Sequence, residues 1–240
     1  MPPRVFIIRH GETEWSLNGR HTGTTDLALT ENGEKRVKAT GKALVGNDRL
    51  IAPRKLVHVF VSPRSRAQRT LELLEIGCRS RLPWNADRKP EDEEPIKTEA
   101  QVEVTEAVRE WDYGEYEGLT SARIREIRKE QGLEGKWDIW RDGCPGGESP
   151  EDVITRLDAL IASIREKYHG PCFSDEEEKG DVLVVAHGHI LRAFAMRWVG
   201  KPLTETALIL EAGGVGTLSY EHHNIEEPAI ILGGGFVVDE

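Results

Sequence analysis

The sequence predicts an α/β fold, with a mostly parallel central sheet and helices on both faces. Three apolar runs have the pattern of buried strands, at residues 5–8, 56–61 and 182–186. Segments with helical character alternate with these runs, which favours a parallel sheet covered on both faces. Hydrophobic residues make up 38% of the 240 residues, which is enough for a packed core. We therefore expect one domain over residues 1–240.

The N-terminal half supplies two strand–helix units. The first strand, residues 5–8, is β-branched and aromatic. A helix is expected over residues 30–44 because Thr30 is a good N-cap, and acidic residues follow it in the first turn. The second strand, residues 56–61, leads into SPRSRAQRTLELLE, which predicts a helix with Ser62 as its N-cap and Pro63 at its first position.

The C-terminal half contains the clearest unit. The strand at residues 182–186 is fully apolar, and a helix is expected to begin at or just after His187. The segments GTLSYEHHN and PAIILGGGFVV predict two short additional strands. Residues 81–100 and 169–180 are polar, and we expect both to form surface loops.

Charge and composition exclude several classes of function. The formal net charge of −10 disfavours nucleic-acid binding, so an anionic ligand would need a local basic pocket. No apolar run has the length of a transmembrane helix, and the first residues lack a signal-peptide pattern. The three cysteines are widely spaced and suggest no disulfide framework, so a cytoplasmic protein is expected, with no membrane partner. The oligomeric state stays open, a homo-oligomer included.

Polar side chains follow each of the three main strands. The first strand ends at Arg9 and His10, the second leads to Arg64 and Arg66, and the third is followed by His187. Ligands of open α/β sheets bind beyond the carboxyl ends of the strands. We therefore expect two histidines and at least two arginines to meet at one edge of the sheet.

This set of residues suits phosphate chemistry. Arginine forks match phosphate oxygens, and a helix that starts at His187 adds backbone N–H groups. A neutral imidazole can attack phosphorus, while the arginines stabilise the developing charge. The leaving alcohol needs a proton, for which Glu110 in the segment REWDYGEYEG is the best candidate, with Asp112 and Glu115 as alternatives. We expect this segment to form a packed loop.

Five elements in order resemble the histidine phosphatase superfamily, in its phosphoglycerate-mutase-like branch. They are RHGETEW with HTG and DLALT after it, SPRSRAQRT, REWDYGEYEG, GGES before a helix, and VVAHGH. The resemblance covers nearly the whole chain. Several segments, such as AHGHILR and WDIWRDGC, are most similar to those of fungal sugar bisphosphatases of this family. The resemblance implies metal-independent hydrolysis of a small sugar phosphate, with sedoheptulose 1,7-bisphosphate favoured and fructose 1,6-bisphosphate second.

The resemblance also assigns roles to matching positions. His10 matches the histidine that becomes phosphorylated, Glu110 matches the proton donor, and the remaining phosphate pocket matches Arg9, Arg66 and His187. Substrate-edge positions match Thr22, Gly23 and Ser16. Many relatives have Asn where this chain has Ser16, so a shorter or water-mediated contact is expected there.

Two residues after the third strand are assigned less firmly. His189 is either a substrate-edge contact or a structural residue, and Arg192 is a candidate ligand for a second phosphate. The HxH pattern of His187 and His189 lacks an evident third ligand, so we expect no metal and no cofactor.

Two other functions stay open. A phosphoglycerate mutase would return the phosphoryl group instead of passing it to water. The basic substrate-covering segment of such mutases is not evident after the acid-bearing loop, where SARIREIRKEQG predicts an ordinary helix. A phospho-ligand-binding protein without turnover is the other alternative, but binding alone gives no reason to keep a proton donor.

Overall fold

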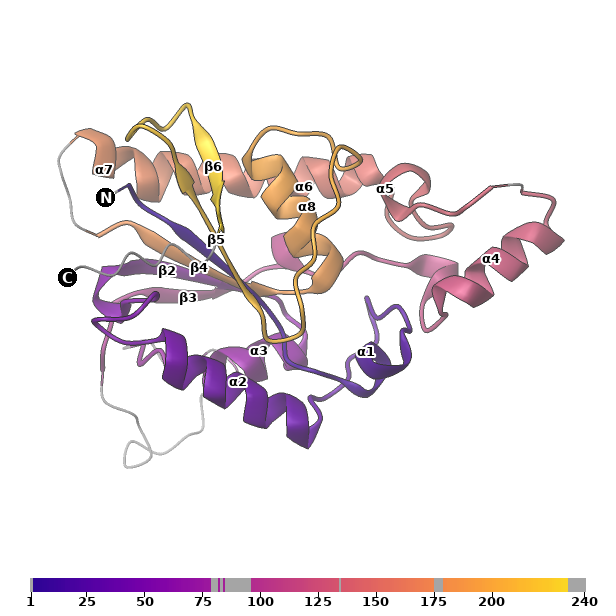
Figure 1. Cartoon of the computed structure of the whole chain (residues 1–240), viewed down its shortest axis with the longest axis horizontal. Coiled ribbons are helices and arrows are strands. Elements are labelled where there is room, and N and C mark those ends of the chain that lie inside the picture. Colours follow the sequence, from indigo (N-terminus) through magenta and orange to yellow (C-terminus); the bar gives the residue numbers. More distant parts are fainter. Residues whose placement is uncertain are drawn as a thin grey trace.

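A six-stranded sheet forms the centre of the computed structural model (Figure 1), which describes residues 2–78, 82, 84, 96–133, 135–174 and 179–232. The strand order is β3-β2-β4-β1-β5-β6. The strands are β1 Val5–Arg9, β2 Leu56–Val61, β3 Gln101–Val104, β4 Asp181–Ala186, β5 Val215–Tyr220 and β6 Pro228–Ile231. The first four in this order run parallel, and β5 and β6 pair antiparallel. The predicted α/β class with a mostly parallel sheet is confirmed.

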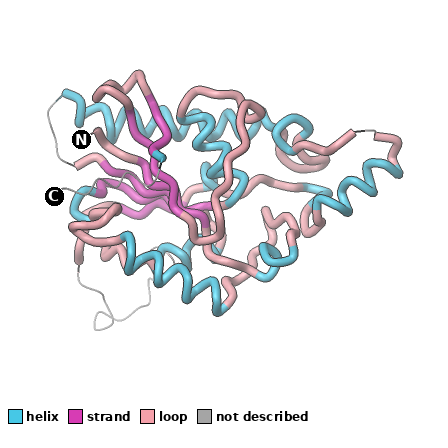
Figure 2. Tube along the Cα trace, viewed as in Figure 1, coloured by secondary structure: helices cyan, strands magenta, loops and turns pink. Residues whose placement is uncertain are grey.

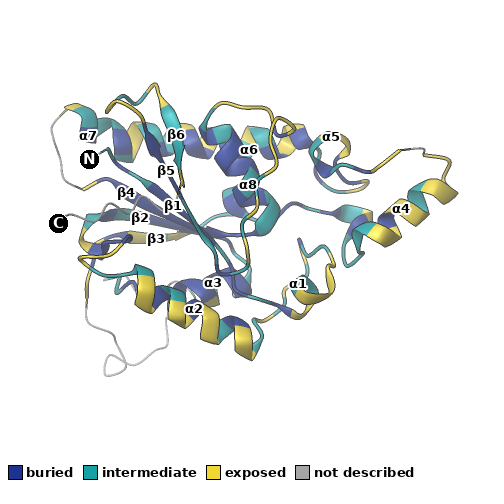
Figure 3. Ribbon diagram, in the orientation of Figure 1, coloured by how far each residue is buried: buried dark blue, intermediate teal, exposed yellow. Residues whose placement is uncertain are grey.

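Helices cover both faces of this sheet (Figures 1 and 2). Helices α6 (Pro150–Ile164) and α8 (Gly188–Trp198) pack on one face, and α2 (Glu31–Leu44) and α3 (Ser65–Leu73) on the other. Successive strand residues point to opposite faces. Val5 and Ile7 therefore join the core under α6 and α8, whereas Phe6 and Ile8 join the core over α2 and α3. The buried strands between the two layers stand out in Figure 3.

The remaining elements are short. They are α1 Glu14–Asn18, α4 Ser121–Glu130, α5 Ile139–Asp142, α7 Gly170–Ser174, the 3₁₀ helices η1 Pro53–Lys55, η3 Glu106–Val108 and η4 Gly114–Tyr116, and the π-helix η5 Arg165–His169. Helices α1, α4 and α5 lie beyond the carboxyl ends of the parallel strands (Figure 1). The described part of the chain holds no helix that is long and apolar enough to cross a membrane.

Several sequence-based expectations are confirmed. Strand β2 has the predicted bounds, and α2 begins after the Thr30 cap, whose side chain accepts from the N–H of Gly33. Helix α8 begins directly after His187, its N-cap residue. The segment REWDYGEYEG is a packed loop with one short 3₁₀ turn, η4, and its aromatic side chains are buried.

The predicted start of the helix after β2 is wrong. Helix α3 begins at Ser65, with Arg64 as its N-cap residue. The Asp26 carboxylate accepts hydrogen bonds from the N–H and hydroxyl of Ser65, at 2.9 Å each. A side chain distant in sequence therefore caps this helix, and Ser62 is free to contact His187 instead.

Two further segments differ from the prediction. Strand β3 was not expected, because its residues alternate between exposed and half-buried and form no apolar run. Residues 169–174 are not a surface loop: His169 ends η5, residues 170–174 form α7, and His169 and Cys172 are buried. Most of the predicted loop at residues 81–100 lies outside the described residues, and within its described part Thr98 and Ala100 are buried.

Candidate active site

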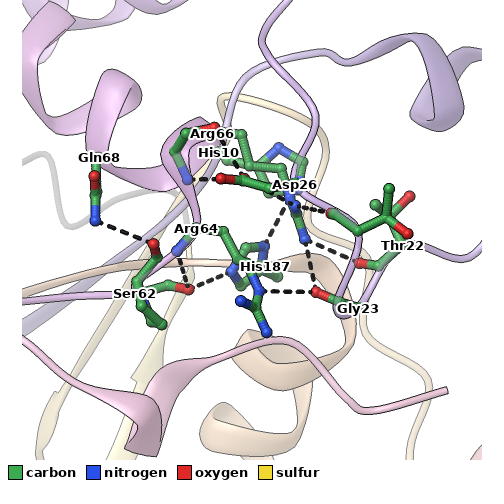
Figure 4. A network of polar contacts seen from close by, with 12 residues as sticks. His10, Thr22, Gly23, Asp26, Ser62, Arg64, Arg66, Gln68 and His187 are labelled. Carbon is green, nitrogen blue, oxygen red and sulfur yellow. Dashed lines mark hydrogen bonds and ion pairs between the residues drawn. The ribbon is translucent and has the colours of Figure 1, made fainter. Parts of the chain in front are cut away.

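The carboxyl ends of three neighbouring strands bring the predicted residues together. Strands β1 and β2 flank β4, with Arg9 opposite Ala186 and Val61 opposite Val185. The residues that follow these positions are His10, Ser62 and His187, so their side chains converge (Figure 4). The imidazole centroids of His10 and His187 are 5.1 Å apart.

His10 is held as a neutral imidazole with a defined tautomer. Its Nδ1 lies 2.7 Å from the carbonyl oxygen of Gly11, and because a carbonyl only accepts, the proton sits on Nδ1. Burial lowers the pKa of His10 well below its usual value, and the Arg66 and Arg9 guanidiniums lower it further. The unprotonated Nε2 therefore carries a lone pair at neutral pH.

His187 is fixed in the opposite tautomer. Arg66 Nε donates to His187 Nδ1 at 3.2 Å, and His187 Nε2 donates to the Ser62 hydroxyl at 2.6 Å. Burial lowers the pKa of His187 well below its usual value, and the Arg66 guanidinium beside it acts in the same direction. His187 is thus a neutral hydrogen-bonding residue, with neither ring nitrogen left as a free nucleophile.

Arg66 is completely buried, and backbone carbonyls hold its guanidinium. Its Nη1 donates to the oxygen of Thr25 at 2.9 Å, and its Nη2 donates to the oxygens of Thr22 at 3.0 Å and Gly23 at 3.4 Å. Figure 4 shows the side chain between this loop and His187. Burial lowers the pKa of Arg66, and the Glu110 carboxylate opposes that effect. Arg66 is therefore a buried cation with a rigid orientation.

Arg9 lies against the start of α8. Its Nη1 donates to the oxygen of Leu210 at 2.9 Å, whereas its buried Nε has no hydrogen-bond partner in the described structure. A Cβ added to Gly188 would lie 3.2 Å from Cζ and Nε of Arg9. Helix α8 thus begins with a glycine where the guanidinium packs.

Glu110 is buried and anchors the first turn of α8. Its Oε1 accepts from the N–H groups of Trp111 at 2.9 Å and Ile190 at 3.0 Å, and its Oε2 accepts from the N–H of His189 at 3.1 Å. Two of these N–H groups belong to the first turn of α8, where backbone donors have no partner within the helix. Because Oε2 accepts only one hydrogen bond, it retains a lone pair that can carry a proton.

The two alternative acids lie in different environments. The Asp112 carboxylate is half-buried and accepts from the N–H of Gly114 at 3.0 Å within its own turn. Glu115 is exposed. Of the three carboxylates, Glu110 is the one that contacts the helix carrying His187 at its N-cap.

His189 and Arg192 pack against the aromatic side chains of Tyr113 and Trp140. The Tyr113 hydroxyl lies 2.7 Å from His189 Nδ1, and the Trp140 ring packs 5.3 Å from the His189 ring. Burial lowers the pKa of His189 well below its usual value, and the Arg192 cation adds to this. Arg192 folds back on its own helix, with Nε donating to the oxygen of Gly188 at 2.9 Å and Cζ lying 5.2 Å from the Trp140 ring centroid.

The remaining predicted positions have different contacts. Thr22 and Gly23 meet Arg66 through their carbonyl groups. A Cβ on Gly23 would overlap the carbonyl oxygen of Trp111, so this position requires glycine. The Ser16 hydroxyl donates to the oxygen of Thr13 at 2.7 Å and accepts from its N–H at 2.9 Å, in the capping box of α1. The described contacts of Ser16 therefore do not join it to the histidines.

Sequence reasoning missed three side chains that organise the site. Tyr113 contacts His189, and Thr70 accepts from the N–H of Gly11 at 3.0 Å while donating to the oxygen of Arg66 at 2.8 Å. Glu117 binds the loop around Gly23. The threonine of SPRSRAQRT was part of the quoted pattern, but contacts to backbone groups distant in sequence leave no local signal.

The arrangement can bind a phosphoryl group against a neutral nucleophile. Two arginines and the N-terminus of α8 supply positive potential, and Glu110 supplies a carboxyl group. Among the described residues, no group of three His, Cys, Asp or Glu side chains is arranged to hold a metal ion. The residues present suit phosphoryl chemistry carried out by protein side chains alone, and independence of metal and cofactor stays a prediction.

Comparisons with known proteins show to which family the chain belongs. Residues 5–89 and 93–228 match the family model of the histidine phosphatase superfamily (branch 1). The chain is 36% identical over 272 residues to the sedoheptulose 1,7-bisphosphatase of Saccharomyces cerevisiae, covering 99% of this chain and 94% of that protein. It is 35% identical over 220 residues to an acid phosphatase of Mycobacterium tuberculosis, covering 91% of this chain and 87% of that protein. A solved structure of an open reading frame from M. tuberculosis superposes with a TM-score of 0.70 at 30% identity and 97% coverage of both chains.

Proposed function

Because the chain belongs to branch 1 of the histidine phosphatase superfamily and is a phosphoric monoester hydrolase, we propose that it hydrolyses a small sugar phosphate through a phosphohistidine at His10. Sedoheptulose 1,7-bisphosphate is the favoured substrate, with fructose 1,6-bisphosphate second. The observation that carries the proposal is the neutral, buried His10, which has its proton fixed on Nδ1 and stands beside two arginines.

The first step forms the phosphoenzyme. His10 Nε2 attacks phosphorus, the N–P bond forms, and the bond from phosphorus to the sugar oxygen breaks. Arg9 and Arg66 bind the oxygens of the transferring group and stabilise the charge that develops on them. His187, whose ring nitrogens contact Ser62 and Arg66, holds the Arg66 guanidinium in place beside His10.

Glu110 transfers the protons. Its carboxyl group gives a proton from Oε2 to the leaving sugar oxygen and becomes a carboxylate. In the second step this carboxylate takes a proton from water as the water attacks the phosphohistidine. The N–P bond breaks, phosphate leaves, and both His10 and Glu110 return to their starting protonation states.

Arg192 supports a substrate with two phosphates. Its guanidinium packs on the Trp140 ring, and its charge interacts with those of Glu110 and Arg9. Aromatic faces pack against the C–H groups of a sugar, and a second cation there suits a second phosphate. The identity of 36% with the yeast sedoheptulose 1,7-bisphosphatase supports the same substrate class.

Phosphate release without added metal tests the proposal. The panel contains sedoheptulose 1,7-bisphosphate, fructose 1,6-bisphosphate, their monophosphates, 3-phosphoglycerate and a phosphopeptide, with His10→Ala as the blank. We expect the two sugar bisphosphates to react far faster than the others. Arg192→Ala is expected to raise KM for the bisphosphates about tenfold or more and to leave the monophosphates nearly unchanged.

Two other results would contradict the proposed function. Transfer of the phosphoryl group between phosphoglycerates, with little release to water, would indicate a mutase. Uniformly slow release across the panel would contradict a sugar bisphosphatase.

A further inference from the structure

Glu117 directs its carboxylate at backbone N–H groups next to the phosphate pocket. Its Oε2 accepts from the N–H of Gly23 at 2.9 Å, and its Oε1 accepts from the N–H groups of Gly23 at 3.0 Å and Thr25 at 2.9 Å. No Lys, Arg or His forms an ion pair with this carboxylate among the residues that the structure describes. Its interactions are therefore with the loop at residues 22–25.

A single peptide unit separates Glu117 from Arg66. The N–H of the Thr22–Gly23 peptide points to the Glu117 carboxylate, and the C=O of the same peptide accepts from Arg66 Nη2 at 3.0 Å. In a trans peptide the N–H and C=O point in opposite directions. Fixing the N–H on Glu117 therefore fixes the carbonyl toward Arg66.

The hydrogen bonds that this peptide makes to Glu117 and Arg66 also strengthen each other. The positive end of the peptide dipole faces a carboxylate, and its negative end faces a guanidinium. Hydrogen bonds in such a chain polarise one another, especially where water is excluded. Arg66 is completely buried, so water does not replace a carbonyl that turns away.

The loop has little freedom to relax. Gly23 packs so closely on Trp111 that a Cβ would overlap the Trp111 carbonyl oxygen. Arg64 Nε also donates to the oxygen of Gly23 at 3.1 Å. Within this packed loop, the Glu117 carboxylate accepts from the Gly23 N–H and so holds the other end of the peptide unit whose carbonyl accepts from Arg66.

We propose that Glu117 is a positioning residue for catalysis, which acts on Arg66 through the Thr22–Gly23 peptide. The continuation to His187 is direct, because Arg66 Nε donates to His187 Nδ1. The inference rests on the phosphate-binding role proposed for Arg66 and does not depend on which sugar is the substrate.

A double-mutant cycle tests this inference. Glu117→Ala, Glu117→Gln and the control Glu106→Ala are prepared in the wild-type and Arg66→Ala backgrounds. Glu106 is an exposed acid of η3 close to Glu117 in sequence. Binding of inorganic phosphate is measured by calorimetry, kcat and KM are measured with p-nitrophenyl phosphate, and thermal denaturation reports folding.

We expect Glu117→Ala to weaken phosphate binding and kcat/KM about 10- to 100-fold, as loss of hydrogen bonds to a charged group implies. In the Arg66→Ala background the same change is expected to alter phosphate binding less than about twofold, because the group on which it acts is gone. Glu117→Gln is expected to cause a smaller loss than Glu117→Ala, since its amide oxygen can accept the two N–H groups that Oε1 holds, whereas the charge and the Oε2 contact to Gly23 are lost. Glu106→Ala is expected to change nothing.

Equal losses in the two backgrounds would overturn the inference, and so would Glu117→Ala with wild-type phosphate binding. If Glu117→Ala does not fold, Glu117→Asp takes its place in the cycle, because it keeps the charge but draws the carboxylate back by one methylene. Unchanged phosphate binding in Arg66→Ala would remove the premise and overturn the inference as well. An enzyme that cleaves p-nitrophenyl phosphate but no sugar bisphosphate would contradict the proposed substrate. The double-mutant cycle would still test the role of Glu117, because it uses no sugar phosphate.

Discussion

Replacing Glu110 by Gln is expected to cost both stability and activity. The structure gives this side chain two tasks, because it accepts from two backbone N–H groups at the start of α8 and from that of Trp111, and it also supplies the proton in the proposed reaction. An amide at this position can accept through one atom only. If its oxygen replaces Oε1, its NH₂ group faces the N–H of His189, and two donors then oppose each other.

The size of the stability loss follows from these contacts. An unsatisfied buried donor costs about 1–3 kcal/mol. We therefore expect a loss of roughly 1–3 kcal/mol, equivalent to a fall in Tm of about 2–12 °C for a chain of this size. Removing the general acid is expected to lower kcat by about 100- to 10,000-fold.

Thermal denaturation, single-turnover kinetics and phosphate binding are measured on Glu110→Gln and on Glu106→Gln. The control makes the same chemical change at an exposed site four residues earlier in the chain. Phosphate binding is expected to persist below the lowered Tm. A full catalytic rate in Glu110→Gln would refute the acid assignment and make Asp112 the next candidate, while an unchanged Tm would refute the anchoring role at α8.

Three further predictions follow from the same contacts. Gly23→Ala is expected to lower the free energy of unfolding by about 1–3 kcal/mol and to weaken phosphate binding, because the new methyl group overlaps the Trp111 carbonyl. Gly46→Ala is the control, because its methyl group meets the flexible Arg49 side chain. Equal losses in the two variants would contradict the packing argument. Burial lowers the pKa of His21 to about 4 and of His169 to about 3, against 6.5 when unfolded, so the unfolded chain binds protons first as the pH falls. The contribution of these histidines to the free energy of unfolding is therefore expected to be fully present above about pH 6.5 and to fall below that pH, by up to about 1.4 kcal/mol per pH unit for each histidine. A free energy of unfolding that stays constant from pH 7 to 5 in denaturant titrations would contradict this. Dialysis against EDTA is expected to leave phosphate release unchanged, and a loss restored by a divalent cation would refute metal independence.

The residues at the candidate active-site edge of the sheet could be predicted from the sequence, because each of them directly follows an apolar strand. An apolar strand ends at Arg9 and His10, another ends before Ser62, and a third ends before His187, so strand order alone brings them together. The fold class and the start of α8 followed from the same alternation of strands and helices.

The misjudged features depend on contacts distant in sequence. Asp26 displaces Ser62 as the cap of α3, and nothing near Ser62 signals this. Strand β3 is an edge strand without an apolar run, so it carries little periodicity. Glu117 and Thr70 act on backbone groups tens of residues away, and such contacts become visible only in three dimensions.

The proposed phosphohistidine is tested most directly by trapping it. The enzyme is mixed with sedoheptulose 1,7-bisphosphate, quenched in base within milliseconds, and digested for mass spectrometry, with His10→Ala treated alongside. The account predicts one acid-labile, base-stable phosphoryl group on Nε2 of His10, absent from the variant. Rapid turnover with no phosphorylated His10 at any time, or a phosphoryl group on another residue, would contradict it.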